Sequence, residues 1–70
     1  MTSKDEAPPT PLFVGITEAA RMIGLGRSKT WELVASGDIF SVREGTRRLI
    51  PMSALNEWAQ RKITEAGGDY

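Results

Sequence analysis

The sequence predicts a small, mostly helical α+β domain with the order helix, tight turn, helix, two-stranded β-hairpin and C-terminal helix. Three observations predict it. Apolar residues recur at helical spacing in three short stretches, a glycine-rich break separates the first two, and β-branched residues flank a glycine-containing turn before the third. A chain of 70 residues can bury one such core, and we expect it to have no enclosed substrate cavity.

The first helix is expected within residues 13–24. Thr17 is the expected N-cap, and Glu18 lies in the first turn, where a carboxylate favours the helix dipole. Gly24 ends the helix, since glycine accepts the left-handed conformation that follows a last turn. Its inward stripe recurs at helical spacing and consists of Ile16, Ala19, Ala20 and Ile23.

A second helix follows the break at residues 24–26 and runs from Arg27 to Ala35, closed by Ser36 and Gly37. Its inward residues are Thr30, Leu33 and Val34. Two short helices joined by a glycine-containing turn form a helix-turn-helix unit. In that unit the second helix enters the major groove of DNA and its N-terminal residues meet base edges.

The hairpin is expected from strands at residues 39–43 and 47–50 around a three-residue loop, 44–46. Strand alternation directs Arg47 and Leu49 to one face and Arg48 and Ile50 to the other.

Pro51 is expected to end the second strand and Ser53 to cap a third helix that continues to about residue 63. One face of this helix is apolar and carries Leu55, Trp58, Ala59 and Ile63. We expect Trp58 to belong to the core.

Charge is distributed unevenly along the chain. Nine basic and nine acidic residues give a net charge of zero, which by itself argues against a nucleic-acid partner. Residues 14–63, however, carry eight basic and five acidic side chains, and the acidic excess lies towards the ends. We expect a flexible tail at 1–11, which holds three prolines, a folded domain at 12–64 and a second tail at 65–70.

Two basic clusters are the candidate DNA-binding residues. On the second helix, Arg27 can pair with a guanine, Ser28 with several base edges and Lys29 with phosphate, while the N–H of Trp31 can reach phosphate. Glu32 can accept from cytosine or pair with Arg27. The hairpin tip can reach the adjacent minor groove or backbone with Arg43, Thr46, Arg47 and Arg48. The alternative is that both clusters are solvated surface residues.

Cysteine and histidine are both absent from the sequence. This excludes disulfides, thiol nucleophiles, imidazole bases and the usual zinc ligands, so we expect no enzyme activity, catalytic residue, cofactor or metal. No apolar run approaches 18 residues, and the first residues lack the character of a signal peptide.

Residues 13–63 resemble the excisionase-type, MerR-like winged helix-turn-helix domains of phages and mobile elements. The resemblance rests on the ordered set ITEAARMIGLGRSKTWELVASGDIFSVREGTRRLIPMSALNEW. It includes the turn from Gly24 to Ser28, the pair Arg47 and Arg48, and the segment from Ile50 to Trp58. Two positions depart from the family pattern: Gly26 stands where Ser or Thr is usual, and Trp31 where Tyr is common.

The resemblance implies a phage excisionase, or recombination directionality factor, similar to those of actinobacterial phages. Such proteins act without catalysis: copies bind side by side on repeated sites in attachment DNA, bend it and direct a phage integrase towards excision. The implied location is the cytoplasm of a phage-infected or lysogenic bacterial host. A small AlpA-like transcriptional regulator is the alternative within the same chemistry. A winged-helix adaptor that binds proteins is the alternative from another class.

Overall fold

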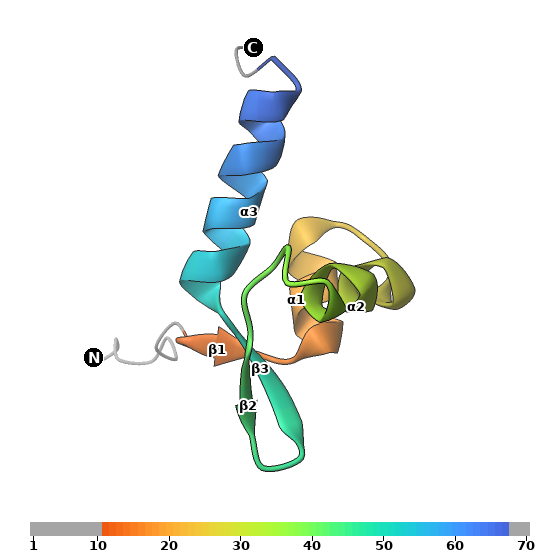
Figure 1. Cartoon of the computed structure of the whole chain (residues 1–70), viewed down its shortest axis with the longest axis vertical. Coiled ribbons are helices and arrows are strands. Elements are labelled where there is room, and N and C mark those ends of the chain that lie inside the picture. Colours follow the sequence, from red (N-terminus) through yellow and green to blue (C-terminus); the bar gives the residue numbers. More distant parts are fainter. Residues whose placement is uncertain (1–10, 68–70) are drawn as a thin grey trace, which may run out of the picture.

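The computed structural model describes residues 11–67, in which three helices pack against a small antiparallel sheet (Figure 1). Of the predicted tails, 1–11 and 65–70, positions 1–10 and 68–70 lie outside the described residues. In chain order the elements are β1 (Phe13–Val14), α1 (Ile16–Ile23), α2 (Arg27–Ala35), β2 (Val42–Glu44), β3 (Arg47–Pro51) and α3 (Met52–Glu65). This is the predicted α+β class and order of helices.

The sheet has three strands in the order β1-β3-β2, where the sequence predicted two. The added strand pairs Phe13 with Pro51 and Val14 with Ile50. The sequence places this stretch in the first helical unit, because two residues are too few to show strand alternation. Phe and Val nevertheless suit a pleated, half-buried surface, and Val14 is buried.

The β2–β3 hairpin, residues 42–51, is tighter than predicted. Glu44 pairs directly with Arg47, so the loop has two residues, Gly45 and Thr46, and not three. Gly45 has a φ of +63°, as the first central position of a type II′ turn requires. The first strand begins at Val42 and not at residue 39. Ile39 is instead fully buried, and its N–H donates to the carbonyl of Leu33 at 3.0 Å.

The first and third helices begin earlier than predicted. The N-cap positions are Gly15 and Pro51, both extended, so the predicted caps Thr17 and Ser53 lie exposed in the first turn of each helix. Each helix follows a strand almost directly, so the end of strand pairing fixes its start, and neither N-cap makes a side-chain hydrogen bond. The third helix ends at Glu65, past the predicted domain end at residue 64.

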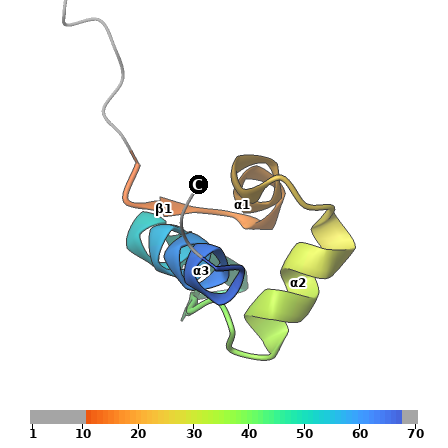
Figure 2. The same cartoon turned by 90° about the horizontal axis from the view of Figure 1, so that it is seen from above.

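The end of the first helix and the whole second helix have the predicted limits. The second helix spans Arg27–Ala35 with Gly26 at its N-cap and Ser36 at its C-cap. Gly24 closes α1 with a φ of +80°, and its N–H donates to the carbonyl of Ala20. Figure 2 shows α1 nearly end-on while α2 lies across the view, so the two helices cross at a steep angle.

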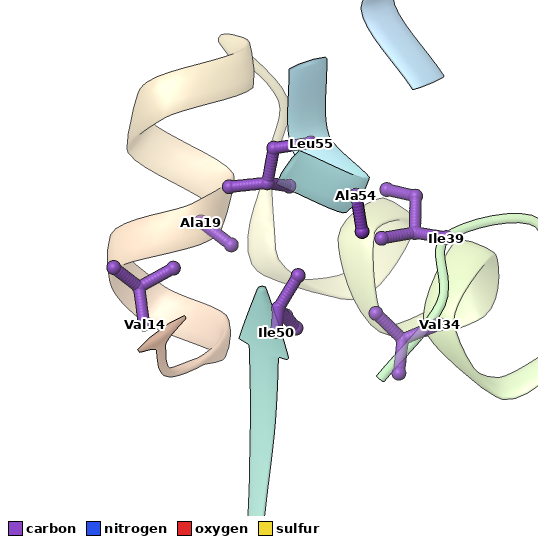
Figure 3. Packing of buried hydrophobic residues seen from close by; sticks show 7 residues of the cluster. All are labelled: Val14, Ala19, Val34, Ile39, Ile50, Ala54 and Leu55. Atoms are coloured by element: carbon purple, nitrogen blue, oxygen red, sulfur yellow. The ribbon is translucent and has the colours of Figure 1, made fainter. Parts of the chain in front are cut away.

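The core gathers one or two side chains from every helix, from β1 and β3 and from the loop after α2 (Figure 3). Its buried members are Val14, Ala19, Val34, Ile39, Ile50, Ala54 and Leu55. Thr30 is the buried polar residue, and its hydroxyl donates to the carbonyl of Gly26 at 2.8 Å. The inward stripes predicted for the helices are therefore confirmed, although six of their members are only partly buried: Ile16, Ile23, Leu33, Trp58, Ala59 and Ile63. In Figure 1, α3 rises from one end of the body and the hairpin projects from the other.

Candidate nucleic-acid interface

The N-terminal half of α2 presents polar side chains to solvent. Arg27, Ser28 and Lys29 are exposed, as sequence analysis predicted. Ser28, Glu32 and Ala35 recur at i, i+4 and i+7, all exposed, on the side of the helix away from its buried residues. This side has the width and the polar groups that a major-groove helix needs.

The predicted clusters on α2 and on the hairpin meet at Trp31, which is 47% exposed. Two hollows flank this indole. One is formed by Ile16, Arg27, Ser28 and Trp31, and the other by Trp31, Arg43, Thr46, Arg47 and Arg48. Elements distant in the sequence thus build one continuous basic surface. Lys29 and Glu32 line neither hollow.

Arg48 is held more firmly than the other hairpin arginines. Its guanidinium carbon lies 5.8 Å from the ring centroid of Trp31, within the range of a cation–π interaction. Its Nη1 donates to the hydroxyl oxygen of Ser41 at 3.4 Å. The residue is half-buried, whereas Arg43 and Arg47 are exposed. Arg48 therefore joins the hairpin to α2.

The arginines of this surface lack acidic partners within residues 11–67. No carboxylate oxygen of that part of the chain lies within 4.0 Å of Arg27, Arg43, Arg47 or Arg48. Arg47 remains unpaired although Glu44 stands opposite it in the hairpin register. Of the alternatives for Glu32, the ion pair with Arg27 is not formed: the carboxylate of Glu32 is exposed and lies 3.9 Å from the ammonium of Lys29. Positive charge is thus left available on this surface.

Basic residues elsewhere in the described chain are paired. Arg21 lies 3.3 Å from Glu18, and Lys62 lies 3.2 Å from Glu65. Arg61 lies 3.7 Å from a carboxylate oxygen of Asp38. These pairs are exposed and belong to α1, α3 and the loop after α2.

Asp38 is the centre of a second cluster, which fastens α3 to the loop after α2. Its carboxylate accepts from the indole Nε1 of Trp58 at 3.0 Å, and its carbonyl accepts from Arg61 at 2.6 Å. Its own N–H donates to the hydroxyl of Ser36 at 3.3 Å. Trp58, predicted as core, is thus partly buried, with its ring against the core and its N–H at the rim.

Three residues of these sites were not singled out in the sequence. Ile16 was assigned only to the core, Ser41 only to a strand, and Asp38 only to the charge count. A correct hairpin register would have brought Ser41 next to Arg48, since it precedes β2 opposite the end of β3. Nothing in the sequence connects Asp38 with Trp58 and Arg61, which lie 20 and 23 residues away.

None of the helices described is long and apolar enough to cross a bilayer. Within residues 11–67, no group of three potential metal-binding side chains of His, Cys, Asp or Glu comes together.

Comparison with known proteins agrees with this architecture. Residues 13–63 match the family model described as a helix-turn-helix domain. A curated relative from Saccharopolyspora erythraea, named "Probable excisionase", is 47% identical over 57 residues, which cover 81% of this chain. The match spans only 58% of that relative's length. No solved structure matches the chain. With the family model covering most of its length, the chain belongs to the helix-turn-helix domain family.

Proposed function

We propose that this chain binds duplex DNA without catalysis and serves as an excisionase. The observation that carries the proposal is a group of arginines on one surface, contributed by both α2 and the hairpin, that have no carboxylate partner among residues 11–67. Positive side chains that neutralise phosphates release counterions, which drives association with DNA. Arginines free of internal ion pairs can make such contacts without breaking a bond within the protein.

In this proposal α2 is the recognition helix and lies in the major groove. Arg27 pairs with the O6 and N7 atoms of a guanine, and Ser28 meets a neighbouring base edge. Lys29 contacts phosphate, and Glu32 accepts from the amino group of a cytosine. Because Lys29 and Glu32 lie 3.9 Å apart and are both exposed, their weak ion pair can open at little cost.

The hairpin acts as the wing of the domain. Arg43, Thr46 and Arg47 surround its tip and are exposed, so they can reach the sugar–phosphate backbone or the minor groove beside the recognition helix. Arg48 and Trp31 line the hollow between wing and helix. A backbone phosphate seated there would meet the indole N–H of Trp31 and the neighbouring guanidinium groups.

The excisionase role is supported by the relative that carries this name. One helix and one wing contact few base pairs, so useful affinity requires several copies on adjacent sites. We propose that copies bind repeated sites of attachment DNA side by side, bend the duplex and assist a phage integrase in excision. We also propose that the domain is a winged helix-turn-helix of the MerR-like type.

The test uses the attachment DNA of the mobile element and its integrase. Footprinting should show protected repeats, gel mobility should show a bend, and excision should depend on added protein. Affinity should fall as salt rises. Lys62→Ala is the matched control for Arg27→Ala, since Lys62 carries the same charge and lies on α3.

Each alternative gives a different result. Protection of a promoter with no effect on excision would identify a transcriptional regulator. Binding that is absent at low salt, or insensitive to salt, would overturn DNA binding and favour a protein-binding adaptor.

A further inference from the structure

The strongest feature beyond the binding surface itself is the contact between Trp31 and Arg48, which joins two elements that share no backbone hydrogen bond. Trp31 is on α2, and Arg48 is on the central strand of the sheet. The guanidinium lies 5.8 Å from the ring centroid, and its Nη1 is tied to Ser41 at 3.4 Å. One side chain therefore connects the recognition helix, the hairpin and the segment that precedes β2.

The hairpin has few other constraints on its orientation. It is a two-stranded ribbon beyond the point where β1 ends, because β1 pairs only with Ile50 and Pro51. Residues 43–47 are all exposed, so no apolar packing fixes them. Two-stranded ribbons are marginally stable and strongly twisted on their own. A single cation–π contact from Arg48, whose pair with Arg43 is next to the closing pair of the turn, can therefore set the direction of this ribbon.

We propose that Arg48 is a positioning residue, which fixes the angle between wing and recognition helix through Trp31 and Ser41. This inference rests on the proposed DNA-binding function and assigns different work to two adjacent arginines. Arg47 is exposed and contacts phosphate. Arg48 is half-buried and sets the distance between α2 and the phosphate that Arg47 contacts.

The geometry of the side chain explains why arginine is required. A planar guanidinium can lie over an indole and still donate from its edge, whereas a lysine ammonium is a point charge with strong hydration. Arg48→Lys therefore keeps the charge and loses the orientation. Arg48→Gln removes both the charge and the orientation. Arg47→Gln is the matched control, because it removes the same charge from the adjacent position and keeps the cation–π contact between Arg48 and Trp31.

The first measurement uses the free full-length protein and needs no DNA. Backbone ¹⁵N relaxation and residual dipolar couplings report the order of residues 43–47 and their orientation relative to α2. We expect the wild type and Arg47→Gln to share one orientation. Arg48→Lys and Arg48→Gln should lower the order parameters towards the value of about 0.6 that marks flexible backbone. Trp31→Leu should lower the order parameters in the same way. Trp31→Tyr should keep them near the wild-type values, because tyrosine also supports a cation–π contact.

The second measurement is binding to a random-sequence 24-base-pair duplex, chosen because phosphate contacts alone govern such binding. Arg47→Gln should reduce the slope of log affinity against log salt by about 0.9. Arg48→Lys should weaken binding about two- to fivefold, the equivalent of an exposed cation–π contact of about 0.5–1 kcal/mol.

If Arg48→Lys keeps the wild-type order parameters at residues 43–47 and the wild-type duplex affinity, the inference is wrong. Arg48 then contributes only its positive charge. If the wild type fails to bind any duplex, including attachment DNA, the proposed function is wrong. The relaxation data then still decide whether Arg48 orients the hairpin, so the two failures are distinguishable.

Discussion

The two ends of the molecule use basic side chains in opposite ways. Around α3 and the loop after α2, Arg61 and Lys62 each lie within 4.0 Å of a carboxylate. Around α2 and the hairpin, Arg27, Arg43 and Arg47 have no such partner among residues 11–67. The same residue type is thus committed to the protein at one end and left available to an external anion at the other.

This difference explains how a chain of zero net charge can bind DNA. Screening limits the reach of exposed charges to about 8–10 Å at physiological salt, so an approaching duplex responds to the local surface and not to the sum. Acidic residues such as Glu57 and Glu65 lie on α3, at the other end of the molecule from the hairpin tip (Figure 1). The comparison predicts that substitutions at one end change binding and at the other change stability.

The largest expected effect is on DNA binding, from removing the unpaired arginines together. Arg27→Ala, Arg43→Ala and Arg47→Ala in one chain should reduce the salt slope of duplex binding by about 1.8, that is, about 0.9 for each phosphate contact of Arg43 and Arg47, and should also remove the base contact of Arg27. Urea unfolding should change by no more than about 1 kcal/mol in total, because exposed surface substitutions have small effects. A loss in the free energy of unfolding well above about 1 kcal/mol would mean that these arginines support the fold, which would contradict the difference between the two ends.

A single substitution in the recognition helix tests whether one of these arginines recognises a base. Arg27→Ala should cost about 1–3 kcal/mol on the preferred site and much less on random sequence, since a bidentate contact with guanine is lost. Competition between a duplex with the preferred site and a random-sequence duplex measures the ratio of the two affinities. If both affinities fall equally, Arg27 contacts only phosphate, and base recognition belongs to Ser28 or Glu32.

The sequence was sufficient for features specified by neighbouring residues. The second helix was predicted with its observed limits, because Gly24 and Gly26 confine its start and because Thr30 and Val34 mark its buried side. The α+β class followed from the same local patterns. The basic clusters were identified from the positions of the basic residues on the predicted second helix and hairpin.

What failed depended on contacts between distant parts of the chain. β1 has two residues and exists because β3 pairs with it, so no local pattern could indicate it. Thr17 and Ser53 suit helix caps intrinsically, but the strands ahead of them set the helix starts. The meeting of both basic clusters at Trp31 depends on the hollow that α2 and the hairpin line together.

The next effect concerns stability at the opposite end of the molecule. Asp38→Ala removes the acceptor of Trp58 and the ionic partner of Arg61. We expect a loss of about 1–2 kcal/mol in the free energy of unfolding, consistent with a charged hydrogen bond and a partly exposed ion pair. The salt slope of DNA binding should not change. A steeper slope would show that Arg61, freed from Asp38, contacts DNA at this end.

The smallest expected effect isolates one hydrogen bond of that cluster. Trp58→Phe keeps an aromatic ring against the core and removes the N–H that donates to Asp38 at 3.0 Å. Because the carboxylate of Asp38 is 41% exposed and can turn to water, the cost should be only about 0.5–1 kcal/mol in chemical unfolding. Duplex affinity should stay within twofold of wild type.

Combining Trp58→Phe with Asp38→Ala should add little to the stability loss of Asp38→Ala alone, since both substitutions remove the same hydrogen bond. Full additivity would mean that Trp58 stabilises the domain through packing, and that Asp38 holds α3 through Arg61 instead.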